Sequence, residues 1–413
     1  MAAEPQIVTL GCRLNAFESE VMREQAQAAG MAEAVIVNTC AVTAEAERQA
    51  RQTIRRLRRE NPGAPIVVTG CAAQLHPEKF ADMPEVDRVL GNSEKLDGAR
   101  LADTDGAKVQ VADIMTARET AHHLIGGFES RARAFVQIQQ GCDHRCTFCI
   151  IPFARGPNRS LPAGAIVEQI RRLSDQGYRE AVLTGVDISS YGVDTDGRSR
   201  LGALAAQILA EVPVLARLRL SSLDPAVIDD DIFRLLADEP RFMPYLHLSL
   251  QAMDDMILKR MKRRHDRAQA LAVAERARPD VVFGADLIAG FPTESEAMFA
   301  ATLAAVEEMD LTHLHVFPYS TRPGTPAARM PAPPGEVRKE RAARLRAAGE
   351  TALARYLQNQ VGREVTVLVE QDNAGHSEHY APVRLDFTAE PGTLVSSRVA
   401  RVEDGRLIGT RIS

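Results

Sequence analysis

The chain has 413 residues, of which 45% are hydrophobic and 25% are charged, and its formal net charge is −5. This length is too great for one ordinary core and predicts two or three domains of globular type. The start of the chain has none of the features of a signal segment, and no apolar run approaches the ~18 residues of a membrane helix. We therefore expect a cytoplasmic protein without a membrane partner, which argues against the secreted and membrane-bound classes.

Positive charge is concentrated in two segments, although the chain as a whole is acidic. Local basic patches can bind phosphate groups even on an acidic protein. Taken alone, however, each segment is better explained as the solvated face of a helix. The first segment contains Arg48, Arg51, Arg55, Arg56, Arg58 and Arg59, and the second contains Lys259, Arg260, Lys262, Arg263, Arg264 and Arg267.

Three short β-branched runs open the chain, and each is followed by a single cysteine and then by a helical pattern. This order is typical of βαβ units in a parallel sheet, and a further strand is expected at residues 86–91. The carboxyl ends of parallel strands share one sheet edge, where ligands bind in open α/β folds. We therefore expect these three dispersed cysteines to form one cluster site, with buried structural cysteines as the alternative. The runs cover residues 6–11, 34–39 and 65–70, and the dispersed cysteines are Cys12, Cys40 and Cys71.

Three more cysteines, called the triplet below, stand together at Cys142, Cys146 and Cys149 after a strand expected at residues 134–139. Their C-x3-C-x2-C spacing places three thiolates on one loop, whereas a cuboidal iron-sulfur cluster normally has four cysteine ligands. One iron would therefore stay open to a small chelating ligand. Structural zinc is the main rival, but no second pair of Cys or His ligands follows Cys149. Disulfides are disfavoured because cytosolic thiols stay reduced.

Further β runs alternate with helical patterns after the triplet, so that six βα units follow one another. They predict an open, partial (βα)6 barrel, in which catalytic groups lie at the carboxyl ends of the strands. The β runs begin near residues 134, 181, 217, 245, 281 and 314, and the helices include residues 163–177 and 294–309.

A proline-rich break at residues 331–335 precedes a basic helix over about 336–360, and the pattern beyond residue 361 is purely β. Its short strands and turn residues predict a small antiparallel β-barrel. Barrels of this size often bind nucleic acid, although a passive stabilising or dimerising module is an equal alternative. The expected fold is α/β, with an N-terminal parallel βαβ domain, a central partial barrel with its basic helix, and a C-terminal barrel, over residues 1–120, 132–360 and 361–413.

Five phrases of the sequence, at residues 9–15, 38–43, 70–74, 142–155 and 318–326, closely resemble those of the methylthiotransferases. This family of radical S-adenosylmethionine (SAM) enzymes matches nearly the whole chain. The resemblance implies two 4Fe-4S clusters and a C-terminal TRAM barrel. It also implies that the triplet holds the cluster that cleaves SAM to a 5′-deoxyadenosyl radical, while the dispersed cysteines hold a second cluster that carries the sulfur. Members of the family that act on tRNA replace a C–H bond of an adenine ring by a C–S bond. Radical chemistry suits this reaction because an aromatic C–H bond is not usefully deprotonated.

Three branches of this family differ in substrate. One modifies an aspartate of a ribosomal protein and usually has an acidic residue where this chain has Arg322. A second acts on isopentenyladenosine in tRNA and usually follows its second cysteine with Ser-[Ile/Val]-Arg-Glu, whereas residues 41–44 here read Ala-Val-Thr-Ala. That phrase, with residues 184–192 and 315–320, resembles the third branch, which methylthiolates N6-threonylcarbamoyladenosine beside the anticodon of tRNA. The first two substrates remain the alternatives.

The resemblance implies roles for five residues besides the cysteines. Phe148 would pack against the SAM adenine, with a plain core aromatic as the equal alternative. Gly185 and Asp187 would lie at the SAM amino group, although Asp187 could equally cap a helix. Ser221 and Ser222 would meet the SAM ribose or carboxylate, or would likewise cap a helix.

The implied substrate adds further expectations about binding. The threonylcarbamoyl group carries a carboxylate, which Arg155 or Arg322 could bind bidentately. Scattered arginines would attract the phosphates of the anticodon loop, and the adenosine would be splayed from its stack between the two clusters. The other expected partner is an electron donor such as flavodoxin or ferredoxin, and the protein itself is expected to be a monomer.

The sequence departs from the family at two positions. Met253 replaces a usual glycine, and if that glycine allows a positive φ, methionine would strain the loop. Thr293 replaces another usual glycine, which we expect to be the milder change.

Two other classes of protein remain as rivals. A cobalamin-dependent radical SAM methylase should show Asp-x-His-x-x-Gly, which the sequence lacks. A non-enzymatic two-cluster electron carrier with an RNA-binding tail would leave the six βα units without a purpose.

Overall fold

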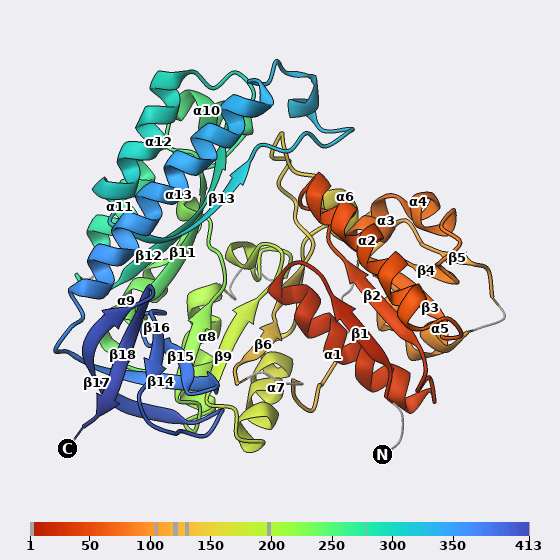
Figure 1. The fold of residues 1–413 in the computed structure, drawn as a ribbon, viewed down its shortest axis with the longest axis horizontal. Helices are drawn as coiled ribbons and strands as arrows, with labels where there is room; N and C mark the ends of the chain where they lie inside the picture. Colours follow the sequence, from red (N-terminus) through yellow and green to blue (C-terminus); the bar gives the residue numbers. More distant parts are fainter. Residues whose placement is uncertain are drawn as a thin grey trace.

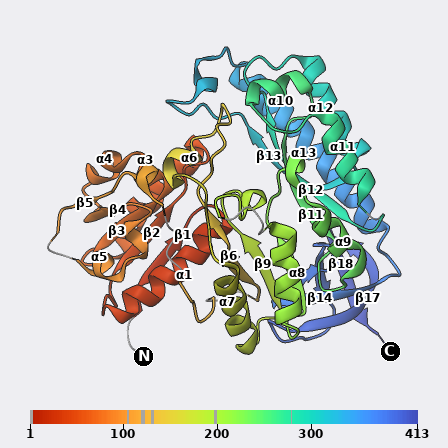
Figure 2. The same ribbon diagram turned by 180° about the vertical axis from the view of Figure 1, so that it is seen from behind.

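The computed structural model describes residues 4–103, 106–118, 123–128, 132–195, 200–277 and 279–412. An N-terminal α/β unit lies beside a central α/β unit, and a small C-terminal barrel packs against one end of the central unit (Figures 1 and 2). The predicted α/β fold with a small closed barrel at its end is confirmed. The domain boundary expected at residue 120 lies outside the described residues. None of the described helices combines the length and apolar character needed to cross a membrane.

The N-terminal unit is one parallel sheet in which the strands follow their chain order. Every residue of its second and third strands is buried, as expected for a parallel sheet covered on both faces. The strands are β1 (Gln6–Thr9), β2 (Val35–Thr39), β3 (Ile66–Gly70), β4 (Arg88–Leu90) and β5 (Val109–Gln110). The helical elements are α1 (Arg13–Ala28), α2 (Ala44–Glu60), α3 (Cys71–Leu75), α4 (Pro77–Ala81), η1 (Glu94–Leu96), α5 (Gly98–Ala102) and η2 (Ile114–Thr116).

The six predicted strands of the central unit are present, but they form two three-stranded parallel sheets. The order is β10-β9-β6 in one sheet and β11-β12-β13 in the other, and isolated bridges join Leu218 to Phe242 and Leu223 to Leu248. The result is an open barrel whose free edges are β6 and β13. The strands are β6 (Ala134–Gln137), β9 (Glu180–Thr184), β10 (Arg217–Leu220), β11 (Tyr245–Gln251), β12 (Val282–Ala289) and β13 (Leu311–Pro318).

Helices cover the outer surface of this open barrel. The longest, α13, crosses β13, where Gly349 leaves room for the side chain of Leu314. Because side chains alternate along a strand, His313 and His315 must then point to the inner side. The helices are α6 (Ile151–Arg155), α7 (Ala163–Asp175), α8 (Leu201–Glu211), α9 (Asp230–Asp238), α10 (Asp255–Met261), α11 (Arg267–Arg276), α12 (Glu296–Glu308) and α13 (Gly335–Gln358), with short elements η3 (Ile188–Ser190), η4 (Pro225–Val227), η5 (Pro326–Arg329), β7 (Gln139–Gln140) and β8 (Arg159–Ser160).

The main hydrophobic core extends beyond the central unit. Ala16, Phe17 and Val21 of α1 are buried in the same cluster as Phe135 of β6 and the apolar side chains of the barrel. Met22 and Ala26 of the same helix pack in a core cluster of the N-terminal sheet, so α1 is shared between the two units.

The C-terminal barrel is closed by five strands in the order β14-β15-β16-β18-β17. The polar run 374–377, which forms β15, lacks the β-branched residues that make strands recognisable, so the sequence did not reveal it. The strands are β14 (Glu364–Gln371), β15 (Ala374–Ser377), β16 (Pro382–Leu385), β17 (Leu394–Glu403) and β18 (Arg406–Arg411).

Tyr380, in the loop between β15 and β16, attaches this barrel to the central unit. Its ring stacks on those of His376 and Tyr245, with centroids 4.6 and 5.1 Å away. The guanidinium groups of Arg133 and Arg219 lie 5.2 and 5.4 Å from its centroid, which favours cation–π attraction. The aromatic ring thus closes the end of the open barrel where the strands begin.

One buried carboxylate lies among the arginines around this closure. Glu180, the first residue of β9, pairs with Arg219 at 2.9 Å, Arg133 at 3.4 Å and Arg217 at 3.5 Å. Burial raises the pKa of Glu180, but the three guanidinium groups outweigh it and lower the pKa to about 2. The charged form of Glu180 is therefore favoured by folding.

Of the two departures from the family pattern, Thr293 has a strained backbone and Met253 does not, which is the reverse of the expectation. Met253 is buried without a positive φ, and its backbone N–H donates to Thr302 Oγ1 at 3.0 Å. Thr293, expected to be the milder change, has a φ of 69°, and its hydroxyl accepts a hydrogen bond from Arg260 at 2.8 Å. The strained substitution is therefore threonine, a β-branched residue in the left-handed region.

We predict that Thr293→Gly is more stable than Thr293→Ala by about 1 kcal/mol, since both lose the hydroxyl and only alanine keeps the strain of a positive φ. Urea unfolding of the two variants measures the difference. The same pair at Thr351, an exposed position inside α13, is the control, because there alanine should be the more stable by about 1 kcal/mol. Equal stability of the two Thr293 variants would contradict the prediction.

We predict that the stability difference between the wild type and Glu180→Gln depends on pH. Because the pKa of Glu180 falls from 4.5 to about 2 on folding, its contribution is complete above about pH 4.5 and is lost as pH falls toward 2. The difference in unfolding free energy should shrink by roughly 2 kcal/mol between pH 7 and pH 3. Denaturant unfolding at a series of pH values measures it, and Glu364→Gln, which removes an exposed ion pair, should show little change. A difference that stays constant over this range would refute the assigned role.

Candidate functional site

The dispersed cysteines lie at one edge of the N-terminal sheet. Cys12, Cys40 and Cys71 directly follow or nearly follow β1, β2 and β3, which are adjacent parallel strands. Gly70 has a φ of 95°, and a Cβ atom there would stand 2.3 Å from the carbonyl oxygen of Thr39, so only glycine lets the chain enter Cys71 this close to β2. Burial raises the pKa of the Cys40 thiol to about 11, and the nearby sulfurs of Cys71 and Cys12 add to the effect. The expected convergence of the three side chains is present.

The triplet lies on a loop fixed by backbone hydrogen bonds. The Cys142 N–H donates to the carbonyl of Gly156 at 3.0 Å, and that of Cys149 donates to the carbonyl of Cys146 at 3.0 Å. Gly141 has a φ of 72°, and a Cβ atom there would come within 1.8 Å of the Pro157 carbonyl oxygen. The loop therefore needs glycine before its first cysteine.

The backbone of Thr147 anchors the middle of the loop to the opposite side of the barrel. Its N–H donates to the carbonyl of Met261 at 3.0 Å, and its carbonyl accepts from the N–H of Ala327 at 2.9 Å. The triplet is thus held by segments that follow the first, the fourth and the last strand of the open barrel, β6, β11 and β13.

The two groups of cysteines approach one another. Burial, and then the neighbouring sulfurs of Cys146 and of Cys71, raise the pKa of Cys149 to about 12. Burial also raises the pKa of Cys142 to about 12. All six cysteines are free thiols, so neither group is consumed by a disulfide. Three thiols on a fixed loop and three at a sheet edge form a donor set suited to iron, which binds thiolates.

Arg155 joins the two groups. It ends α6, the short helix that begins two residues after Cys149, and its Nε donates to the sulfur of Cys71 at 3.1 Å. Its remaining nitrogens bind Glu18 and donate to Asn15 Oδ1 at 2.6 Å. Both oxygens of Glu18 are used by this guanidinium, so the pair is bidentate.

Glu18 is the centre of this buried ionic group. Lys95, which has no exposed surface, donates to Glu18 at 2.6 Å, and Gln140 donates to the same carboxylate at 2.8 Å. Burial raises the pKa of Glu18, but Arg155 and Lys95 outweigh it and lower the pKa to about 2. Sequence reasoning missed Glu18 and Lys95, because a lone glutamate in a helix and a lone lysine in the short element η1 carry no pattern.

The structure places Asp187 beside the triplet. Its carboxylate lies 2.9 Å from His144 Nε2 and 4.0 Å from the Cys142 sulfur, and it accepts from Ser190 Oγ at 2.6 Å. It makes no capping bond to a backbone N–H, which leaves the helix-cap alternative without support. Gly185 is tightly packed, because a Cβ atom there would stand 2.8 Å from the carbonyl oxygen of Gln139.

The other expected SAM contacts are placed near the same end of the barrel. Ser221 and Ser222 follow β10, and the next helical turn is capped by Asp224 rather than by either serine. Phe148 is partly buried, and its ring meets that of Phe291 edge-on at 6.4 Å. That contact accounts for Phe148 as a core aromatic, and its role toward SAM stays a prediction.

Arg155 and Arg322 do not suit the carboxylate-binding role suggested for them. Arg155 is 2% exposed and bound to Glu18, Asn15 and Cys71. Arg322 is 4% exposed and paired with the carboxylate of Glu47 in α2. Both guanidinium groups therefore hold parts of the protein together, and we do not carry the assignment forward.

The basic segment at residues 259–267 is also used internally. Arg263 and Arg264 pair with the buried carboxylate of Asp224 at 3.3 and 3.1 Å, and Arg263 reaches the Cys146 sulfur at 3.7 Å. Arg267 pairs with Glu308 at 2.5 Å. The expected solvated helix face fails for these three arginines, which bind carboxylates and carbonyls of neighbouring elements. Lys259 and Lys262 of the same segment are exposed, as that interpretation expects. The arginines of α2 are more exposed, as in the ion pair of Arg56 with Glu60.

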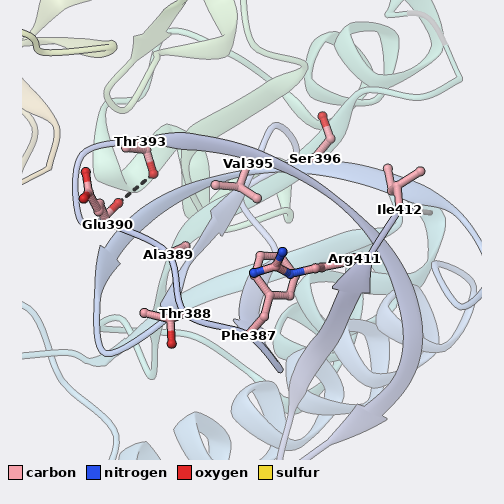
Figure 3. Close-up of a pocket in the computed structure, with 9 residues that line it drawn as sticks. All are labelled: Phe387, Thr388, Ala389, Glu390, Thr393, Val395, Ser396, Arg411 and Ile412. Atoms are coloured by element: carbon pink, nitrogen blue, oxygen red, sulfur yellow. Dashed lines mark hydrogen bonds between the residues drawn. The ribbon is translucent and has the colours of Figure 1, made fainter.

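A separate depression of about 390 Å³ lies on the C-terminal barrel, where Figure 3 shows its lining. The Arg411 guanidinium lies over the Phe387 ring at 5.0 Å, and Thr393 donates to the backbone carbonyl of Glu390 at 2.6 Å. No cysteine lines this depression. It is therefore distinct from the site formed by the two groups of cysteines.

Comparison with known proteins agrees with this arrangement. The Radical SAM superfamily matches residues 136–306, and the family described as Uncharacterized protein family UPF0004 matches residues 5–91. The radical S-adenosylmethionine methyltransferase TsrM from Kitasatospora setae, solved with cobalamin and a [4Fe-4S] cluster, is 14% identical, with a TM-score of 0.57 over 79% of this chain and 74% of that chain. This likeness is one of fold. The central unit therefore contains a radical SAM domain.

Relatives that match nearly the full length of the chain identify its family within the radical SAM proteins. The threonylcarbamoyladenosine tRNA methylthiotransferase MtaB of Rickettsia prowazekii is 48% identical over 97% of this chain and 96% of its own. The protein of that name from Thermotoga maritima is 36% identical over 98% and 96%. The tRNA-2-methylthio-N(6)-dimethylallyladenosine synthase of Cereibacter sphaeroides is 35% identical over 98% of both chains. The chain belongs to the radical SAM methylthiotransferase family, and it is a transferase that uses SAM and 4Fe-4S clusters.

Proposed function

We propose that this protein converts N6-threonylcarbamoyladenosine beside the tRNA anticodon to its 2-methylthio derivative, using two 4Fe-4S clusters. The observation that supports it most directly is the meeting of two three-cysteine groups at Arg155, which touches Cys71 and ends the helix that follows Cys149. A single cluster would leave one of these groups of cysteines with no metal to bind. The 48% identical relative carries the name of this activity.

The residues divide the work between the two groups. Cys142, Cys146 and Cys149 would hold the cluster that binds SAM, and the bound cofactors supply the radical chemistry that no acid–base pair can provide. Asp187 lies beside this loop and Gly185 packs against Gln139, just before it; both would orient the amino group of SAM. Ser221, Ser222 and Phe148 would complete the SAM site.

The dispersed cysteines, Cys12, Cys40 and Cys71, would hold the second cluster. Arg155 donates to the sulfur of Cys71. Arg155 and Lys95 carry two positive charges against the one negative charge of Glu18, so this group keeps a net positive charge that can support the negative charge of bound thiolates. The short helix α6 begins two residues after Cys149 and ends at Arg155, so it would connect the residues that hold the two clusters.

The C-terminal barrel and exposed arginines would bind tRNA. The depression with Arg411 over Phe387 offers a cation and an aromatic ring, a combination that suits nucleotides. We further propose an electron donor such as flavodoxin or ferredoxin, a monomeric cytoplasmic enzyme, and functional units over residues 1–120, 132–360 and 361–413.

A second candidate substrate is dimethylallyladenosine in tRNA. It is favoured by the 35% identity to the synthase of Cereibacter sphaeroides, which covers 98% of this chain. We rank it second because the MtaB protein of Rickettsia prowazekii is closer in sequence.

We predict about eight irons per chain after anaerobic reconstitution, because two 4Fe-4S clusters hold that number. Replacing the triplet with alanines should leave about four irons, and replacing the dispersed cysteines should also leave about four. Iron and sulfide analysis measures the content. About four irons in the wild type, or bound zinc alone, would remove the two-cluster proposal.

We predict that cells lacking the gene lose 2-methylthio-N6-threonylcarbamoyladenosine from their tRNA. The intact gene should restore the nucleoside, whereas Cys142→Ala should not, since it removes a ligand of the SAM-binding cluster. Mass spectrometry of tRNA nucleosides measures the change. Loss of the dimethylallyl derivative instead would favour the second candidate, and a changed ribosomal protein mass would overturn both.

A further inference from the structure

Two imidazoles and a carboxylate come together on three adjacent strands of the open barrel. They belong to His247 of β11, Asp286 of β12 and His315 of β13, which lie side by side in one parallel sheet (Figures 1 and 2). One donor atom from each residue lies within 4.8 Å of the other two. The three residues lie within their strands, whereas the cysteines of both groups follow strand ends. The group is therefore separate from the sites proposed for the iron-sulfur clusters.

The distances in this group match those between two ligands of one metal ion. Asp286 Oδ1 lies 3.1 Å from His247 Nε2 and 3.1 Å from His315 Nδ1. Zinc binds nitrogen and oxygen ligands at about 2.0–2.2 Å, so two neighbouring ligand atoms of one ion stand roughly 3 Å apart. The two imidazole rings have their centroids 4.5 Å apart, which lets both direct a nitrogen to the same ion.

Hydrogen bonds from both imidazoles to Asp286 would give the same distances without an ion. The exposure of His315 argues against that explanation. Its side chain is 57% exposed on β13, a free edge of the open barrel, whereas the Asp286 side chain is 20% exposed. A hydrogen bond that water can replace contributes little stability, so it does not explain why an imidazole stands at this position. An ion site, in contrast, needs a path from solvent, and His315 lies on that path.

The orientation of His247 is fixed from the other side of its ring. His247 is 2% exposed, and its Nδ1 lies 2.8 Å from the Tyr245 hydroxyl, which leaves Nε2 directed at Asp286. Histidines that bind metals almost always have their other ring nitrogen hydrogen-bonded, because that bond fixes the orientation of the ring. Tyr245 thus supplies the outer contact that a metal-binding histidine requires.

A glycine in the middle of β12 makes this outer contact possible. Gly284 is the register neighbour of His247, and a Cβ atom there would stand 2.3 Å from the Tyr245 hydroxyl oxygen and 2.6 Å from His247 Nδ1. Glycine weakens the interior of a strand and often marks a place of close approach. The local sequence therefore gives up strand stability where the ring of His247 is held.

The donor set indicates the class of ion. Imidazole nitrogens suit zinc and other first-row divalent ions, whereas Mg²⁺ and Ca²⁺ prefer oxygen ligands. Two histidines and one carboxylate are a ligand set of zinc sites and of non-haem ferrous sites that keep positions open for water or another ligand. Open positions here would face the interior of the barrel, because the side chains of His313 and His315 lie on that side of β13.

We propose that His247, Asp286 and His315 bind one divalent transition-metal ion of the zinc or ferrous type, in addition to the two clusters. Tyr245 is a positioning residue for His247. The proposal does not depend on which nucleoside the enzyme modifies.

The test uses the full-length protein after anaerobic reconstitution of its clusters. Zn²⁺ is the probe, because such ligands generally bind it more tightly than Fe²⁺ and because it has no redox chemistry. After removal of weakly bound metal, mass spectrometry measures zinc per chain and X-ray absorption identifies its ligands. We expect about one zinc per chain with nitrogen and oxygen ligands at about 2.0–2.2 Å, whereas zinc held by cysteines would show sulfur at about 2.3 Å.

Substitutions separate an ion site from a set of hydrogen bonds. Asp286→Asn keeps the size of the side chain and an acceptor oxygen but removes its charge, and His315→Gln removes one imidazole. Each should weaken zinc binding by about a hundredfold or more, measured by competition with a chelator. Tyr245→Phe keeps all three ligands and should weaken it about 10–100-fold, since only the outer contact to His247 is lost. Asp310→Asn makes the matched change at an exposed ion pair and should have no effect.

The wild-type result alone can overturn the proposal, whatever the folding of the variants. Absence of zinc, or zinc bound only through sulfur, would do so. Zinc affinity that is unchanged by both Asp286→Asn and His315→Gln would overturn it as well. Iron is measured in the same samples, and loss of zinc with retention of about eight irons supports the assignment. Since iron and zinc are counted separately, failure of the zinc site leaves the two-cluster proposal standing.

Discussion

The bidentate pair of Arg155 with Glu18 is the interaction on which the arrangement of the site depends. Glu18 comes from α1, Arg155 from the helix after the triplet, and Lys95 from a third segment, yet all three are buried together. Removing one partner of such a group leaves an unpaired charge in the interior, which typically costs about 3–5 kcal/mol. The pair fixes how the sheet edge of the N-terminal unit faces the mouth of the barrel, and so fixes the relative position of the six sulfurs.

A second group of charges attaches the C-terminal barrel at the opposite end of the open barrel. Glu180 pairs with Arg219, Arg133 and Arg217, and the ring of Tyr380 covers two of these guanidinium groups. Glu370 and Glu378 of the C-terminal barrel supply two more carboxylates, to Arg133 and Arg217 respectively. Arg217 and Arg219 also donate to carbonyl groups of the C-terminal barrel, for example from Arg219 to Ser377 at 2.8 Å. The small barrel is therefore attached by ion pairs and hydrogen bonds that cross to the central unit. Its hydrophobic core, which includes Leu357 of α13, is a cluster distinct from the main core.

Much of this could be predicted from sequence because the relevant signals are local. The β-branched runs before Cys12, Cys40 and Cys71 and the spacing of the triplet carry their meaning in a few adjacent residues. The ionic groups could not be predicted, because Glu18 and Arg155 are 137 positions apart and pair only in the folded chain. The chemistry of their side chains suggests that Arg155 and Arg322 bind the substrate carboxylate. In the folded chain both are buried and paired with carboxylates of the protein itself. Thr293 shows the same limit on a smaller scale, since a sequence does not state the φ angle of a loop residue.

The sharing of α1 between two units has a consequence for biosynthesis. Phe17 and Val21 leave the ribosome early, but the strands that bury them, from β6 onward, are made more than a hundred residues later. Arg155, the partner of Glu18, also arrives after that interval. Until then, the apolar face of α1 and the carboxylate of Glu18 stay exposed to water. Such a state is prone to aggregation during synthesis. The sheet edge that bears Cys12, Cys40 and Cys71 is thus completed late in translation. Its completion depends on residues of the barrel and not only on the unit that contains those cysteines.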